Sequence, residues 1–245
     1  FDLMIAFKKL WTIKNGQRPS RKLDDIAQSI LQESKIPLAD GHDTYYSDIG
    51  TYLDYNLQDI KLLPKLDEVV NASGYFTSLQ HLIQCELATT PMVTACATSL
   101  FLQDEEFKER IPDKPQFEKV DYTGADIQDP PIGRYECMAI MDIKAMYHSN
   151  VKLHNICWTT ILSKDKKHES AKDCGNGISF TQEKDGLLGR TMDRLTVKRN
   201  EYKALMKEAR SSGDKIAYTK WDGAQFATKS MVASLYGIAG DSKYG

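Results

Sequence analysis

Apolar positions recur at helical spacing along the N-terminal part of the chain. Residues 1–35 predict helix in two pieces, the second with apolar side chains at Leu23, Ile26 and Ile30. Residues 43–70 predict another helical segment, with one face that runs until Pro64. One face of this helix carries Tyr52, Tyr55, Asp59, Leu62 and Leu63. A further apolar helix is predicted over 76–102, with buried candidates Cys85, Leu87 and Val93.

The pattern then changes twice. Residues 103–135 are charged and rich in proline, which predicts an irregular linker with short strands. Residues 137–142 form an apolar run of strand length that ends in Asp142, and the segment around Tyr147 is typical of a turn that enters a helix. A polar stretch follows over 163–185.

The clearest helical pattern lies near the C-terminus. An apolar face runs from Gly186 to about Arg210, the segment 211–214 interrupts it, and a second helix is predicted over 219–235. So short a break predicts that the two helices pack antiparallel. A second face of the first helix is basic, and in the other helix Gln225 and Lys229 share a face. The basic face comprises Arg199, Lys203, Lys207 and Arg210.

Composition narrows the classes of protein to consider. The net charge of −2 excludes a globally basic nucleic-acid binder, so any such contact must be local. The five cysteines include no Cys-x-x-Cys pair, which favours reduced intracellular thiols over a zinc site or a disulfide framework. No run of eighteen apolar residues suggests a membrane span, and the first residues do not resemble a signal peptide.

Two features carry candidate chemistry, and each has a plainer interpretation. A carboxylate at the end of a buried strand is costly unless it is paired or binds a metal, so Asp142 is either a metal ligand or the cap of the next helix. The basic face is either a solvated surface or a phosphate cradle, in which Arg199, Lys203 and Lys229 converge on a triphosphate. Together the acid and the cations suggest metal-assisted phosphoryl transfer.

Five segments in sequence order resemble motifs of the family B DNA polymerases. Asp142 to Ser149 resembles the first palm motif, usually Asp-x-x-Ser-Leu-Tyr-Pro-Ser, and Gln225 to Gly237 resembles the fingers motif. Arg199-x-x-x-Lys203 matches the opposing fingers helix. Tyr122-Thr-Gly-Ala125 resembles the segment that joins the exonuclease and polymerase modules, and Tyr55-Asn-Leu-Gln-Asp59 resembles the third exonuclease motif. The neighbourhood most resembles enzymes of T-even-like tailed phages.

The resemblance implies template-directed DNA synthesis with two Mg²⁺ ions, in which Asp142 and the backbone carbonyl of Ile143 are metal ligands and Asp142 is catalytic. Tyr147 would lie against the sugar of the incoming nucleotide and exclude a 2′-hydroxyl. The other implied contacts to the nucleotide come from Ala145, Met146, Arg199, Lys203, Lys229 and Tyr236. The implied contacts to DNA come from Tyr122, Gly124 and Gly237.

The resemblance also implies a separate 3′–5′ exonuclease site, with Asp59 as a metal ligand and Tyr55 orienting the attacking water. Taken alone, these two residues indicate only an amphipathic helix.

Three positions depart from the family pattern. The usual Pro after the tyrosine is His148, the usual Ser is Ala145, and an expected Asn is Ala233. The phosphate ligands are all present, so we interpret these departures as lineage variation. The short spacing from Asp142 to Lys229 favours a primer–template enzyme over a protein-primed one.

The family's second palm carboxylate motif, Asp-Thr-Asp-Ser, does not occur in the chain. We therefore expect an internal fragment of a larger polymerase that catalyses neither reaction alone, and primer extension by the isolated chain would contradict this. Two alternatives remain open: a non-catalytic DNA-binding module, and an exonuclease-dominant protein with a degenerate polymerase site.

The expected fold is α+β, with part of an RNase H-like exonuclease domain, the first half of a palm and a two-helix antiparallel fingers hairpin. The expected divisions are 1–70 exonuclease, 71–115 helical connector, 116–185 palm, 186–237 fingers and 238–245 a resumed palm. The expected partners are primer–template DNA, deoxynucleoside triphosphates and a sliding clamp bound through regions that the chain lacks, with no membrane. The expected location is the cytoplasm of a phage host.

Overall fold

The computed structural model describes residues 2–17, 19–107, 128–143, 145–162, 171–174 and 177–239. Tyr122 and Gly124, the predicted DNA contacts of the connecting segment, lie outside these residues. The chain folds as two compact units. The first unit comprises Phe1–Ser99 with Thr196–Met231, and the second comprises Leu100–Leu195 with Val232–Gly245.

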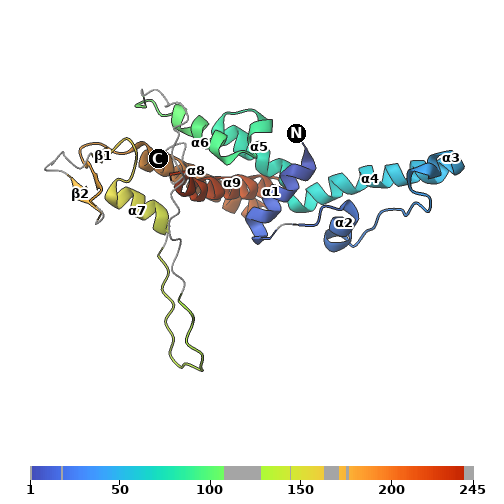
Figure 1. Cartoon of the computed structure of the whole chain (residues 1–245), viewed down its shortest axis with the longest axis horizontal. Coiled ribbons are helices and arrows are strands. Elements are labelled where there is room, and N and C mark those ends of the chain that lie inside the picture. The colour runs from blue at the N-terminus through green and yellow to red at the C-terminus, as the bar shows by residue number, and fades with distance from the viewer. Residues whose placement is uncertain are drawn as a thin grey trace. The chain divides into compact units, whose positions relative to one another are not determined.

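Helices dominate the first unit (Figure 1). Its α-helices before residue 99 are α1 (Leu3–Asn15), α2 (Leu23–Leu31), α3 (Thr44–Ser47), α4 (Ile49–Val70), α5 (Ala72–Ile83) and the start of α6 (Val93–Leu102), with short 3₁₀ turns at Gly41–Asp43 and Leu87–Thr89. Helix α1 packs on α5, and α2 packs on α4. The two helical pieces predicted for 1–35 are thereby confirmed.

Local sequence explains where these helices begin and end. Asp2 caps α1 by accepting a hydrogen bond of 2.8 Å from the Met4 amide, and Gly16 closes it in the left-handed conformation at φ 70°. Asp48 caps α4 in the same way as Asp2 caps α1, through the Thr51 amide at 3.1 Å. Asn71 separates α4 from α5 with a φ of 56°.

The helical face predicted to run until Pro64 continues beyond it, because α4 extends to Val70. Pro64 removes the hydrogen bond to the carbonyl of Ile60, and Ile60 lies on the exposed side of α4, where water can solvate that carbonyl. Beyond the proline, Leu66 and Val70 are buried at helical spacing with Leu62, and this burial outweighs the cost of the lost hydrogen bond.

The prediction of a single helix over 76–102 is wrong, because two helices occupy this range. Helix α5 ends at Ile83, where Gln84 adopts the left-handed conformation, and α6 begins at Val93. The predicted buried side chains of Cys85, Leu87 and Val93 are each only partly buried, since they lie at or between the helix ends. The buried residues of α5 are instead Ala72, Tyr75, Phe76, Leu79 and Ile83.

The second unit contains α7 (Met146–His154) and a small antiparallel sheet of β1 (Ile161–Leu162), β2 (Lys172–Asp173) and β3 (Ser179–Phe180). The strand order is β1-β3-β2, with Phe180 opposite both Ile161 and Lys172. The helix predicted to follow the turn near Tyr147 is confirmed as α7.

The buried strand predicted over 137–142 is absent. Residues 128–143 run as extended chain, yellow-green in Figure 1, with every side chain exposed; Ile140 and Met141 are 89% and 94% exposed. Within the described residues no strand pairs with this segment, so its backbone has no ladder to join. The short strands predicted for the linker are also absent from its described parts, 103–107 and 128–135.

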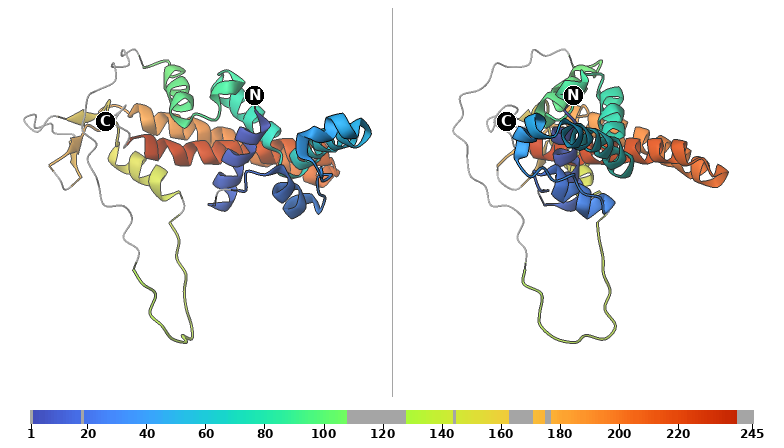
Figure 2. Two further views of the ribbon diagram at one scale, coloured as in Figure 1. Left: turned by 45° about the vertical axis from the view of Figure 1, so that its right-hand side comes forward. Right: turned by 90° about the vertical axis from the view of Figure 1, so that its right-hand side faces the viewer.

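Helices α8 (Leu187–Ser212) and α9 (Lys215–Ala239) form an antiparallel pair (Figures 1 and 2). Gly213, at φ 75°, ends α8, and Asp214 starts the next helix by accepting a hydrogen bond of 2.9 Å from the Ala217 amide. The Tyr202 and Trp221 rings stack across the pair at 5.8 Å. The predicted antiparallel hairpin is therefore confirmed, and α9 is longer at both ends than predicted.

Candidate nucleotide-binding site

Asp142 lies at the exposed end of the extended segment, three residues before the cap of α7. The cap is Ala145, in the left-handed conformation at φ 52°, and no side chain caps the helix. The alternative in which Asp142 caps the next helix is therefore not what the structure shows. Exposed Ile143 and Met146 flank the same turn, whose first helical amides lack a side-chain acceptor.

Tyr147 and Tyr236 stack on each other. Their ring centroids are 4.2 Å apart, with 26° between the planes, and both residues belong to the second unit. Tyr147 is 46% exposed and Tyr236 45%, so both residues remain accessible to a further group. The structure thus brings together two predicted nucleotide contacts that lie 89 residues apart.

The predicted phosphate ligands all lie in the part of the hairpin that belongs to the first unit. The Tyr202 ring stacks on the Trp221 ring, which fixes the register of α8 against α9. In this register Arg199 lies level with about Ala224. Lys229 lies about 8 Å from that level, toward the end of the hairpin where α8 begins. Lys203 lies one turn beyond Arg199 on α8. The structure thus brings the three predicted phosphate ligands onto one helical hairpin, two on α8 and one on α9.

Arg199 is the most informative of these cations. Its side chain is partly buried, and its Nε has no hydrogen-bond partner within the part of the chain that the structure describes. A buried charged donor without an acceptor is costly and uncommon. An anion is the kind of ligand that would satisfy it.

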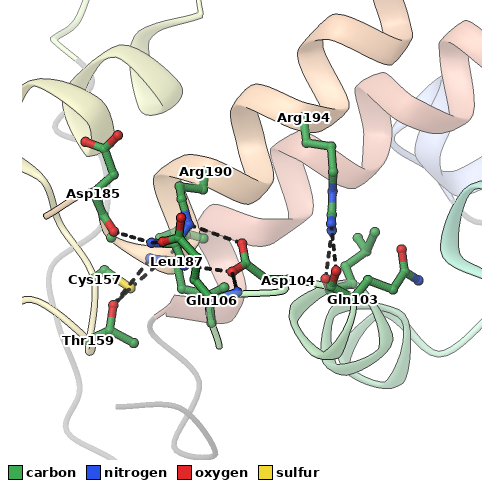
Figure 3. Close-up of polar contacts among 12 residues, drawn as sticks. Gln103, Asp104, Glu106, Cys157, Thr159, Asp185, Leu187, Arg190 and Arg194 are labelled. Atoms are coloured by element: carbon green, nitrogen blue, oxygen red, sulfur yellow. Dashed lines mark hydrogen bonds and ion pairs between the residues drawn. The ribbon is translucent and has the colours of Figure 1, made fainter. Parts of the chain in front are cut away.

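The base of α8 is held by contacts that the sequence pattern did not reveal (Figure 3). Arg190 binds the Asp104 carboxylate at 2.8 Å and 3.2 Å, reaches Glu106 at 3.2 Å, and donates to the carbonyl of Asp185. Arg194 donates to carbonyls at the end of α6, at 2.8 Å for Leu100 and 3.3 Å for Gln103. Cationic donors at a helix C-terminus stabilise its free carbonyls.

Asp104 titrates abnormally because of this contact. Burial opposes its ionisation, but the hydrogen bond and the charge of Arg190 outweigh burial, so the pKa of the carboxyl lies below its ordinary value. The same hydrogen bond raises the pKa of Arg190.

Three side chains satisfy the first amides of α8. Asn155 accepts from the Gly186 amide at 2.8 Å, Thr159 from Leu187 at 3.3 Å, and the Cys157 sulfur from Leu188 at 3.4 Å. The Asn155 amide group also donates to the carbonyls of Thr181 and Lys184, at 2.6 Å and 2.8 Å. The start of α8 is therefore fixed by the loop that follows α7.

Tyr55 and Asp59 meet through a residue that was not predicted. Lys35 Nζ lies 2.7 Å from Asp59 Oδ2 and 2.8 Å from the Tyr55 hydroxyl, and it also lies over the Tyr55 ring. Burial lowers the pKa of Lys35, but the contacts with Asp59 and Tyr55 outweigh burial and raise it. No local signal marks Lys35, because it precedes Tyr55 by 20 residues and lies outside any helix.

The described residues do not complete a magnesium site. They contain no group of three or more His, Cys, Asp or Glu side chains that could hold a metal ion. Asp142 offers one carboxylate beside the Ile143 carbonyl, and Asp59 offers one buried oxygen, Oδ1, that lacks a hydrogen-bond partner in the described chain. Mg²⁺ needs six oxygen ligands in near-octahedral geometry.

Gly237 lies exposed on α9, and a Cβ added there would meet nothing within 4 Å among the described residues. The chain itself therefore does not require glycine at this position, and the predicted DNA contact stays a prediction. No described helix is long and apolar enough to cross a membrane.

The fold that carries these residues resembles that of a solved polymerase. The chain is similar in fold to the family B DNA polymerase of the archaeon Pyrobaculum calidifontis, with a TM-score of 0.66 at 19% identity. The match covers 89% of this chain and 30% of that one.

A sequence model of the family described as DNA polymerase family B matches residues 84–244. The chain belongs to DNA polymerase family B.

Curated relatives agree with this assignment. The chain is 31% identical over 129 residues to the DNA polymerase delta catalytic subunit of Mesocricetus auratus, a match covering 49% of this chain and 11% of the relative. It is 25% identical over 275 residues to the DNA polymerase alpha catalytic subunit of Xenopus laevis, covering 98% of this chain and 18% of the relative. It is 28% identical over 134 residues to the DNA polymerase of guinea pig cytomegalovirus, covering 50% and 12%. The chain thus spans well under a quarter of the length of each relative.

Proposed function

We propose that this chain carries the incoming-nucleotide site of a template-directed DNA polymerase, which transfers deoxynucleotides to a primer 3′-hydroxyl. The observation that carries the proposal is the state of Arg199, whose buried Nε has no hydrogen-bond partner in the described chain. Arg199 lies on α8, the helix that is expected to bind phosphates. Family membership supports the same conclusion.

In this proposal the cations of the hairpin bind the β- and γ-phosphates of the nucleotide. Arg199 and Lys203 contribute from α8 and Lys229 from α9, as charge-assisted donors to phosphate oxygens. The first amides of α7, near Ala145 and Met146, are further candidate donors to phosphate oxygens. Tyr147 lies against the sugar and excludes a 2′-hydroxyl, while Tyr236 packs near the base pair.

Asp142 and the Ile143 carbonyl are proposed as two ligands of a magnesium site that further residues would have to complete. Bound Mg²⁺ supplies Lewis-acid stabilisation of the phosphate charge and activation of the primer hydroxyl. The exposed position of Asp142 leaves its carboxylate accessible to such an ion.

Nucleotide binding by the chain itself tests the phosphate assignment. Titration with a fluorescent deoxynucleoside triphosphate is expected to show about tenfold to hundredfold weaker binding for Arg199→Ala, since a charged hydrogen bond is lost. The matched control is Arg210→Ala, an exposed arginine on the same basic face. Equal losses for both variants would favour the alternative of a DNA-binding module with diffuse electrostatic contacts.

A second function, 3′–5′ excision, is favoured by the contacts among Lys35, Tyr55 and Asp59. Asp59 Oδ1 is buried without a hydrogen-bond partner in the described chain and is a candidate metal ligand, while Lys35 holds the other oxygen and the tyrosine hydroxyl in place. In the full-length protein, Lys35→Met is expected to lower primer excision and leave extension intact. Lys61→Met, at an exposed position on α4, is the control, and an equal effect of the two variants would remove the assignment.

The biological setting remains a proposal. The relatives named above come from animals and a cytomegalovirus, so they do not support the T-even-like phage subtype. The sequence motifs are the basis for proposing viral replication and a location in the host cytoplasm. They are also the basis for proposing primer–template DNA and a sliding clamp as partners, and for the boundaries of the exonuclease, palm and fingers. The exonuclease-dominant alternative predicts excision without extension.

A further inference from the structure

Asp193 on α8 holds α7 at two points one helical turn apart. His148 Nε2 lies 2.9 Å from one carboxylate oxygen of Asp193, and Lys152 Nζ lies 2.7 Å from the other. His148 and Lys152 are four residues apart and share a face of α7. A carboxylate that binds two residues of one helix in this way fixes both the axial position and the rotation of that helix.

Helix α7 depends on such contacts. It has nine residues, too few to be stable in isolation, and Val151 is the buried one among them. Its cap, Ala145, contributes no side-chain hydrogen bond. The Lys172 ammonium donates to the Leu153 carbonyl at the other end of the helix. The half that carries Tyr147 is in contact with Asp193, through His148, and with Tyr236, through the ring stack.

Asp193 is itself held in place. Arg190, three residues earlier, binds Asp104, and Arg194, the next residue, binds carbonyls at the end of α6 (Figure 3). All of these residues belong to the second unit. The base of α8 thus serves as a fixed reference from which Asp193 orients α7.

We propose that Asp193, acting through His148 and Lys152, is a positioning residue for Tyr147 and sets how strictly the site selects deoxyribose over ribose. The inference rests on the proposed role of Tyr147 as the sugar gate. His148 directly follows Tyr147, and its side chain is 15% exposed, whereas that of Asp193 is 41% exposed. The proline usual at this position in the motif has no side-chain donor, which makes the contact a property of this chain.

Geometry shows why rotation of α7 matters. Helical side chains reach about 5–6 Å from the axis, so a rotation of about 20° would move the tyrosine ring by about 2 Å. A displacement of that size would make room for a 2′-hydroxyl beside the ring. A contact that prevents the rotation therefore preserves discrimination without touching the nucleotide.

A double-mutant cycle in the full-length protein tests the proposal. The measured quantity is the ratio of kcat/KM for a deoxynucleotide to kcat/KM for the matching ribonucleotide. Asp193→Ala is expected to lower this ratio about tenfold, and to lower it no further when Tyr147→Ala is already present. His148→Gln keeps a side-chain donor and is expected to retain most of the ratio.

The control is Glu201→Ala, which removes a carboxylate of α8 that pairs with Lys198 at 2.9 Å. It is expected to leave the ratio unchanged. Circular dichroism establishes that each variant folds, and if Asp193→Ala does not, His148→Ala replaces it because it removes one of the two contacts.

The outcomes separate the two claims. If Tyr147→Ala leaves the ratio unchanged, the sugar-gate assignment itself is wrong. If Tyr147→Ala lowers the ratio and Asp193→Ala does not, only the positioning role is wrong. An Asp193→Ala effect of equal size with and without Tyr147 would also contradict it, because the residue would then act elsewhere.

Discussion

At the scale of single residues, the ion pair of Asp104 with Arg190 makes the stability of the second unit depend on pH. The pKa of Asp104 in the folded chain lies below its ordinary value of 3.8, so the folded state binds its proton less readily than the unfolded state does. The stabilisation is present above about pH 4 and is lost as the pH falls through the folded pKa.

Asp104→Asn is therefore expected to lower the thermal midpoint near pH 6 and to flatten the loss of stability below pH 4. Thermal unfolding followed between about pH 2 and pH 6 measures this. Asp129→Asn, at an exposed position in the extended segment, is the control and is expected to match the parent chain. Parallel acid profiles for the parent and Asp104→Asn would contradict the assignment.

The cysteines differ sharply in expected reactivity. Burial, together with the neighbouring Cys85 thiol, raises the pKa of Cys96 to about 12. Because the thiolate is the reactive form, Cys96 should resist alkylation at pH 8 while exposed Cys137 and Cys174 react. Mass spectrometry after timed labelling resolves the sites, and labelling of Cys96 as fast as Cys174 in the folded chain would refute the expected protection.

At the scale of secondary structure, several side-chain hydrogen bonds join the loop after α7 to the start of α8. Asn155 makes three side-chain hydrogen bonds there, including one to the first free amide before α8. Gly186 is needed at this point, since an added Cβ would lie 2.7 Å from Cys157 Cβ.

Asn155→Ala is expected to destabilise the fold by about 2–4 kcal/mol, because partly buried partners lose their hydrogen bonds. Urea unfolding monitored by circular dichroism measures the change. Asn200→Ala, exposed on the same α8, should cost under about 0.5 kcal/mol. A loss at Asn155 no larger than that at Asn200 would show that the junction does not hold α8.

The elements differed in how far the sequence predicted them. The long periodic runs predicted α8, α9 and their short connection because burial and helix formation there favour the same residues. The apolar run 137–142 led to a wrong prediction, since an apolar run indicates what a strand would bury but not whether a partner strand is present. At Pro64 the helix continues where the sequence predicted an interruption. The burial of Leu66 and Val70 outweighs the local tendency of proline to break a helix.

At the scale of the whole molecule, the sequence motifs predicted some of the candidate functional residues and missed others. The motifs indicated Tyr147, Tyr236, Arg199 and Lys229, because their chemistry requires those residue types at those spacings. Lys35 and the Asp193 contacts were not predicted, since they join residues 20 to 45 positions apart without a repeating pattern. Such pairings depend on the packing of elements rather than on local sequence.

The most direct test of the central claim is single-turnover primer extension by the full-length protein with Mg²⁺. Asp142→Asn keeps the shape of the side chain and removes its charge, and the account predicts a loss of nucleotide incorporation of at least about a thousandfold. Asp129→Asn, in the same exposed segment, should extend the primer at the parent rate. Extension by Asp142→Asn within a few-fold of the parent rate would contradict the account.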